Sequence, residues 1–79
     1  MKFVILTTES KTEHEVAWIE ANTPEGNFVI QPQHAPTTLI LSPAKDLIYC
    51  LKTGKHEVVT PKKGGLLHIN TEGATTLIF

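Results

Sequence analysis

The sequence predicts an all-β fold, a two-sheet antiparallel β-sandwich of about 8–10 short strands. Short apolar runs rich in β-branched and aromatic residues recur roughly every 8–12 residues, with turn-forming residues between them. No segment shows the apolar period of about 3.6 residues that an amphipathic helix of ordinary length requires. The chain has 79 residues, so we expect one domain over residues 1–79 with a small margin of stability.

Eight segments have the composition of strands. The firmest prediction is a hairpin in which the glycine-containing loop Lys52–Lys55 joins two apolar runs. We interpret Thr7–His14 as a polar connection, because it has neither strand alternation nor helical period. The expected strands are Phe3–Thr7, Val16–Ala21, Phe28–Ile30, Thr37–Leu41, Leu47–Leu51, His56–Thr60, Leu66–Ile69 and Ala74–Phe79.

Alternation along the second expected strand assigns its two faces. Ile19 and Ala21 share one face, Trp18 and Glu20 share the other, and Val16 is displaced if a bulge intervenes. The same logic applied to every strand predicts the core. We expect it to contain Phe3 or Ile5, Ile19, Phe28, Ile30, Ile48 or Tyr49, Val58, Leu67, Ile69 and Leu77.

The stretch 23–36 contains two stiff turns around one very short apolar strand. Pro24 fixes its own φ, and Gly26 supplies the positive φ that such a turn commonly needs. Pro32 and Pro36 lack backbone donors, so the residues between them are expected to form a rigid corner and not part of a sheet. Such a corner is either a packing device or a docking surface.

Composition and charge argue against several classes of function. The net charge is −1 and there is no basic block, which argues against nucleic acid as a partner. No apolar run reaches the roughly 18 residues needed to cross a bilayer, so direct membrane insertion is not expected. Cys50 stands alone, which favours a reducing compartment and a buried structural thiol.

Chemistry-bearing residues do not form a recognisable site. The four histidines, His14, His34, His56 and His68, show no close pairing and no acidic ligand at a recognisable spacing. No Ser or Cys stands in a nucleophile-elbow context, and Gly64-Gly65 does not belong to a phosphate-binding loop. We therefore expect no catalytic residues, metal, cofactor or small-molecule ligand.

Two apolar residues leave alternatives open. Trp18 either folds back onto a sheet edge or belongs to an exposed patch that a partner covers. In the run Thr37–Leu41, either Leu39 with Leu41 or Ile40 must face outward unless both faces of the strand are buried.

The order of these motifs resembles one protein family. Pro24-Glu25-Gly26-x-Phe28-x-Ile30-x-Pro32-x-His34-Ala35-Pro36, then Pro43 after the next strand, then Gly64-Gly65-Leu66-Leu67-x-Ile69, is similar to the N-terminal β-sandwich domain of the F-type ATP synthase epsilon subunit, called delta in mitochondria. The resemblance covers residues 3–79. It implies a non-catalytic central-stalk subunit that couples the gamma subunit to the c ring of a rotary proton-translocating ATP synthase.

The resemblance also implies contacts and a location. The loop Pro24, Glu25, Gly26 and Asn27 aligns with the family's contact to the c ring, and Lys11, His34, Leu39 and Trp18 are the expected contacts to gamma. We expect two separate patches, a polar loop tip and a sheet face with apolar exposure. The implied location is a peripheral complex on the cytoplasmic side of a bacterial membrane. A freestanding β-sandwich interaction module recruited to another assembly is the alternative.

The sequence departs from the family pattern at four places. Thr12-Glu13-His14 replaces the apolar-x-Gly that often precedes the second strand. Gln33 and Ala44 stand where glycine is expected, and at Gln33 we therefore expect the corner not to adopt a positive φ. The chain ends at Phe79, whereas family members continue into a C-terminal helical hairpin that carries an inhibitory movement and, in some members, an ATP site. We expect neither property in this chain.

Overall fold

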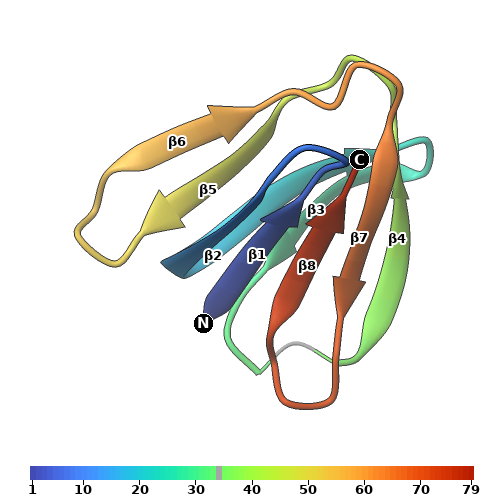
Figure 1. Cartoon of the computed structure of the whole chain (residues 1–79). Coiled ribbons are helices and arrows are strands. Elements are labelled where there is room, and N and C mark those ends of the chain that lie inside the picture. Colours follow the sequence, from blue (N-terminus) through green and yellow to red (C-terminus); the bar gives the residue numbers. More distant parts are fainter. Residues whose placement is uncertain (34) are drawn as a thin grey trace.

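The computed structural model describes residues 1–33 and 35–79, and these are all-β, as predicted (Figure 1). The described residues form eight strands, which are β1 (Lys2–Leu6), β2 (Lys11–Thr23), β3 (Gly26–Ile30), β4 (Thr37–Leu41), β5 (Leu47–Leu51), β6 (His56–Val59), β7 (Gly65–Ile69) and β8 (Thr75–Ile78).

The strands hydrogen-bond in the order β4-β7-β8-β1-β2-β5-β6, and β3 pairs with β2 beside this path. In Figure 1, β1, β8, β7 and β4 lie side by side toward the viewer, and the β5–β6 hairpin extends to one side. One pairing differs from the all-antiparallel prediction, since β1 and β8 are parallel. The turn after β7 reverses the chain, and this brings β8 to β1 in the same direction. We call β4-β7-β8-β1 with the first half of β2 sheet A, and β3, the second half of β2, β5 and β6 sheet B.

Strand β2 joins the two sheets. Its first five residues, Lys11–Glu15, pair with β1, and its later residues pair with β3 and β5. The predicted polar connection is therefore wrong for residues 11–14, because pairing with β1 outweighs their poor strand propensity. Lys11, Thr12 and Glu13 are exposed, whereas His14 is half-buried, with its ring centroid 5.2 Å from that of Tyr49. The bulge proposed for this strand is confirmed between Val16 and Trp18. It allows both Val16 and Ile19 to be buried.

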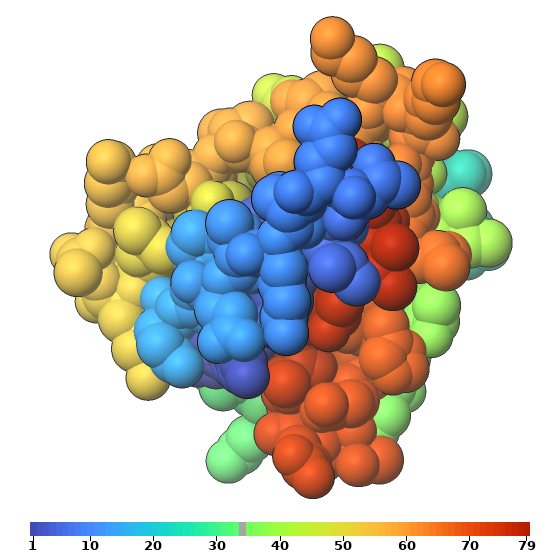
Figure 2. Space-filling model, viewed as in Figure 1, coloured from blue at the N-terminus to red at the C-terminus, as the bar shows by residue number. Residues whose placement is uncertain are grey.

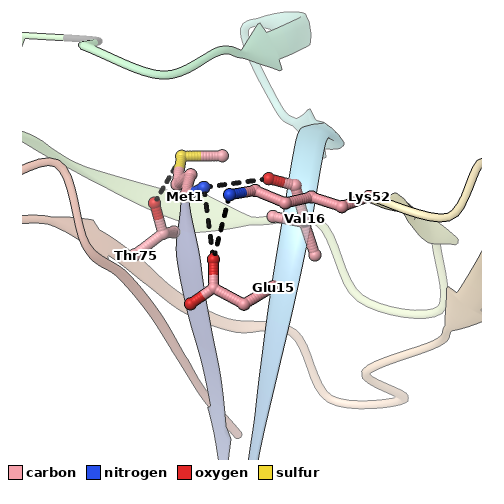
Figure 3. Close-up of polar contacts among 5 residues, drawn as sticks. All are labelled: Met1, Glu15, Val16, Lys52 and Thr75. Atoms are coloured by element: carbon pink, nitrogen blue, oxygen red, sulfur yellow. Dashed lines mark hydrogen bonds and ion pairs between the residues drawn. The ribbon is translucent and has the colours of Figure 1, made fainter.

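The bulge lies where the N-terminal residue meets β2, β8 and the residue that follows β5 (Figure 3). The Met1 ammonium donates to the Val16 carbonyl oxygen at 3.1 Å, and the Val16 amide donates to the Met1 carbonyl at 2.9 Å. One Glu15 carboxylate oxygen lies 3.6 Å from the Met1 nitrogen and 3.6 Å from Lys52 Nζ. The buried Thr75 hydroxyl donates to Met1 Sδ at 3.7 Å. These contacts fix the point at which the chain passes from one sheet to the other.

The core lies between the two sheets, and most of its predicted members are confirmed. The prediction that Val58 belongs to the core is wrong, because Val58 is 56% exposed on the outer side of edge strand β6. Phe28 is only half-buried, because the space between β3 and β4 is incompletely covered. The buried apolar residues are Phe3, Val16, Ile19, Ala21, Ile30, Leu41, Leu47, Tyr49, Cys50, Leu67, Ile69 and Leu77.

Two residues without glycine's freedom adopt left-handed backbone conformations. Gln33 has φ 69° and Ala44 has φ 58°. The expectation that Gln33 would not take a positive φ is wrong, because the turn after Pro32 requires that conformation whatever side chain stands there. Ala44 is held by its amide, which donates to the Pro61 carbonyl at 2.9 Å.

Candidate docking surface

Four large apolar side chains lie side by side across the outer face of sheet A. The strand registers pair Ile40 with Leu66, Leu66 with Ile78, and Ile78 with Leu6. Residues paired in this way have Cβ atoms about 4.5–5.5 Å apart in antiparallel strands. We call Ile40, Leu66, Ile78 and Leu6 the apolar row. In the space-filling view the surfaces of β8 (red), β7 (orange) and β4 (light green) are neighbours (Figure 2).

The exposure of the apolar row distinguishes it from ordinary surface residues. Ile40 is 67% exposed, Leu66 and Ile78 are each 43% exposed, and Leu6 is 37% exposed. Isolated exposed apolar residues are normal on protein surfaces, but contiguous ones mark contact sites. Four adjacent strands contribute one side chain each, so the row is a continuous surface.

Charge and polarity border the apolar row. Lys11 pairs with Leu6 and so ends the row at β2, where its ammonium lies 3.9 Å from a Glu13 oxygen. The next outward row along the same strands is mainly polar, and in it the Thr38 hydroxyl lies 2.9 Å from His68 Nδ1. The surface is therefore an apolar centre with a polar margin, as in protein–protein interfaces.

The residues predicted to contact gamma do not form one patch. Lys11 lies beside the apolar row, whereas Leu39 faces inward and packs against the core, with Ile40 as the outward neighbour. Trp18 is half-buried on the outer face of sheet B, where its ring meets His56 edge-to-face at 5.2 Å. His34 lies outside the described residues.

Leu6, Leu66 and Ile78 were missed by sequence reasoning. Each occupies an outward position of a short strand, but apolar residues stand on both faces of these strands, so alternation alone does not single them out. These three residues can be recognised as one exposed apolar surface only when strand order and register place their side chains together.

The loop predicted to contact the c ring is a rigid turn between β2 and β3. The Thr23 hydroxyl donates to the Gly26 carbonyl and accepts from the Glu25 amide, both at 3.1 Å, and Gly26 has φ 131°. Asn27 Nδ2 donates to Asn22 Oδ1 at 3.2 Å. The loop thus has a fixed shape, and Asn27 helps to maintain it.

A hollow of about 260 Å³ separates this loop from β4. We call it the seam hollow. It contains residues from both predicted patches, since Glu25 of the loop and Leu39 of β4 line the same space. The two patches expected to be separate are therefore adjacent at this point. The lining residues are Thr23, Pro24, Glu25, Phe28, Thr38, Leu39 and Ile40.

The described residues offer few groups for chemistry. Within 1–33 and 35–79, no group of three or more His, Cys, Asp or Glu residues could hold a metal ion. The Cys50 thiol is buried. Burial, and secondarily the negative charge of Glu57, raise the pKa of Tyr49 above its usual value of 10.0. Across the described part of the chain, no helix is long and apolar enough to cross a membrane.

Comparison with known proteins gives similarity in structure alone. No protein-family model matches the sequence, and no curated protein matches it significantly. A chain in the cryo-EM structure of the Euglena gracilis mitochondrial ATP synthase (OSCP/F1/c-ring) aligns with a TM-score of 0.86 and 23% identity, covering 96% of this chain and 48% of that one. A chain in the Tetrahymena thermophila mitochondrial ATP synthase (central stalk/c-ring) aligns with a TM-score of 0.78 and 19% identity, covering 99% and 61%.

The present chain spans about half to three fifths of the length of these neighbours. At sequence identities of 23% and 19%, the similarity shows a shared fold and no more. Residues 1–79 thus have the fold of a domain found in a chain of each of these two mitochondrial ATP synthase structures.

Proposed function

We propose that residues 1–79 form a single epsilon-like β-sandwich domain that acts as a non-catalytic central-stalk subunit of a rotary ATP synthase. Two lines support this proposal. The motif order from Pro24 to Ile69 resembles the epsilon family. The fold matches chains in two mitochondrial ATP synthase structures, one of OSCP/F1/c-ring and one of the central stalk and c-ring. The subunit would sit on the surface of the coupling membrane within a peripheral complex. The solved neighbours are mitochondrial, so the bacterial location expected from the sequence rests on the sequence alone.

The apolar row is the observation that carries the proposal. A joint in a rotor must resist torque, and an apolar centre that excludes water gives more binding free energy than exposed polar contacts. We assign the contact with gamma to Leu6, Ile40, Leu66 and Ile78, with Lys11 at its edge. Leu39, the residue chosen from the sequence, acts behind this surface by supporting β4.

The loop Pro24–Asn27 is assigned to the c ring. Its fixed turn can present Glu25 without a further ordering cost, because the Thr23 hydroxyl already holds the backbone. Hydrogen bonds and screened charges at such a tip contribute about 1 kcal/mol each. The gamma contact should therefore provide most of the affinity, and the ring contact should fix orientation.

Binding to the gamma subunit of the same organism tests the assignment. Leu66→Asp places a charge at the centre of the apolar row and should weaken binding by at least about 1 kcal/mol, roughly fivefold. Val58→Asp is the matched control, because Val58 is similarly exposed but lies on sheet B. Equal affinities of both variants and the wild type in titration calorimetry would contradict the proposed surface.

A further inference from the structure

The seam hollow lies where the two sheets fail to join. Among the described residues, β3 pairs only with β2 and β4 pairs only with β7, so each has a free edge. One end of the space between these edges is closed by the Ser42 amide, which donates to the Asn22 carbonyl at 3.0 Å. The hollow is thus a fixed opening in the sandwich wall.

The floor of the hollow is apolar. Phe28 and Leu39 are half-buried there, and Ile40 is 67% exposed at its edge. A cavity of about 150 Å³ lined by such residues can bind benzene. The seam hollow, at about 260 Å³, has room for one large apolar side chain.

The rim of the hollow carries a negative charge, the carboxylate of Glu25. Glu25 is exposed, and no nitrogen of a described lysine or histidine lies within ion-pairing distance of its carboxylate. The turn that carries Glu25 is fixed by the Thr23 hydroxyl. A cation that approaches the hollow therefore meets a carboxylate that forms no ion pair with the described residues.

We infer that the seam hollow is a docking site for a short extended segment of a partner protein, in which a large apolar side chain stands next to a Lys or Arg. The apolar side chain fills the hollow, the cation faces Glu25, and the segment's backbone runs along the free edge of β4. Backbone pairing at a sheet edge supplies affinity, and pockets for individual side chains supply selectivity. This deepens the proposed function, since it makes the loop Pro24–Asn27 one wall of an apolar site and not a purely polar tip. It rests on the proposed function only for the identity of the partner.

The test uses short peptides and needs no rotor subunit. The probe is the acetylated and amidated tripeptide Arg-Leu-Thr, titrated into the ¹⁵N-labelled protein and followed by NMR. Saturable shift changes confined to residues 23–28 and 38–40 are expected. Arg-Ala-Thr, which lacks the large side chain, and Glu-Leu-Thr, which reverses the charge, should each bind at least about fivefold more weakly.

Charge reversal in the protein makes the test specific. Glu25→Lys should invert the preference, so that Glu-Leu-Thr binds more tightly than Arg-Leu-Thr, while the backbone contacts of the turn are retained. Glu72→Lys, an equal charge change at an exposed position of the 70–73 turn, should leave the preference for Arg-Leu-Thr unchanged. Shifts elsewhere, equal shifts for all three peptides, or an unchanged preference in Glu25→Lys would overturn the inference. Peptide selectivity in a protein that does not bind gamma would overturn the proposed function and leave the docking site standing.

Discussion

Leu39 and Ile40 are consecutive residues of β4 that face opposite sides of sheet A. Leu39 packs against the core beneath the sheet, and Ile40 is 67% exposed above it. The alternation resolves the ambiguity that the sequence leaves in this strand, because Leu39 faces the core and Ile40 faces outward.

The two residues should respond differently to truncation. Leu39→Ala removes buried contacts and should lower the free energy of unfolding by about 2 kcal/mol, whereas Ile40→Ala should change it by less than about 0.5 kcal/mol. Urea denaturation of both variants measures the difference. Equal destabilisation would mean that the assigned faces of β4 are incorrect.

The left-handed residues predict stabilising substitutions. An L-residue in the αL conformation costs roughly 1–2 kcal/mol that glycine avoids. Glycine in turn loses more backbone entropy on folding, which offsets part of this gain. Gln33→Gly and Ala44→Gly should therefore each raise the free energy of unfolding by about 0.5–1 kcal/mol. Thermal melting would show the increase.

Gly64→Ala is the opposing control for these substitutions. Gly64 has φ 79°, and an added Cβ would lie 2.8 Å from the Leu41 carbonyl oxygen. This variant should therefore be clearly destabilised. A melting temperature that falls for the two glycine variants would contradict the strain assigned to Gln33 and Ala44.

Thr75 is buried, and its hydroxyl contacts a weak acceptor, Met1 Sδ. Thr75→Val keeps the shape and exchanges a weak hydrogen bond for apolar burial, so stability should change by less than about 1 kcal/mol in either direction. Thr75→Ser keeps the hydroxyl but loses a methyl group from the core and should cost about 1 kcal/mol. Chemical denaturation compares the three proteins, and a larger loss in Thr75→Val than in Thr75→Ser would show that the hydroxyl matters more than the packing.

The raised pKa of Tyr49 predicts a pH dependence. Between its unfolded value of 10.0 and its higher folded value, the folded protein holds a proton that the unfolded chain releases. This contribution to stability is therefore fully present below about pH 10 and is lost as the pH rises through the folded pKa. Tyr49→Phe should show a smaller loss of stability than the wild type above pH 10, and identical pH profiles would contradict the assignment.

Particular residues show how far the sequence predicts the fold. The β5–β6 hairpin and the inward positions Ile19, Ile30 and Leu67 follow from turn composition and alternation, and the structure confirms them. The first half of β2 cannot be predicted from turn composition and alternation, because its polar residues acquire strand structure only by pairing with β1. Val58 was assigned to the wrong face because β6 is an edge strand with apolar residues on both sides.

The candidate site depends on information beyond any local pattern. Leu6 and Ile78 stand far apart in the sequence and become neighbours only through the parallel pairing of β1 with β8. The seam hollow likewise requires two free edges that strand composition does not reveal. Resemblance to a family suggests the loop Pro24–Asn27, Lys11 and the β4 strand as locations of the proposed contacts, and the strand register identifies which side chains are exposed near Lys11 and on β4.

Site-specific cross-linking in the assembled enzyme tests the central claim most directly. A benzophenone attached to Leu66→Cys, in a Cys50→Ala background, would be photolysed within the ATP synthase of the same organism and the product identified by mass spectrometry. The proposal predicts a covalent product with the gamma subunit from position 66 and none from Val58→Cys on the opposite sheet. Absence of the chain from the purified enzyme, or a gamma product from position 58 and not from position 66, would contradict it.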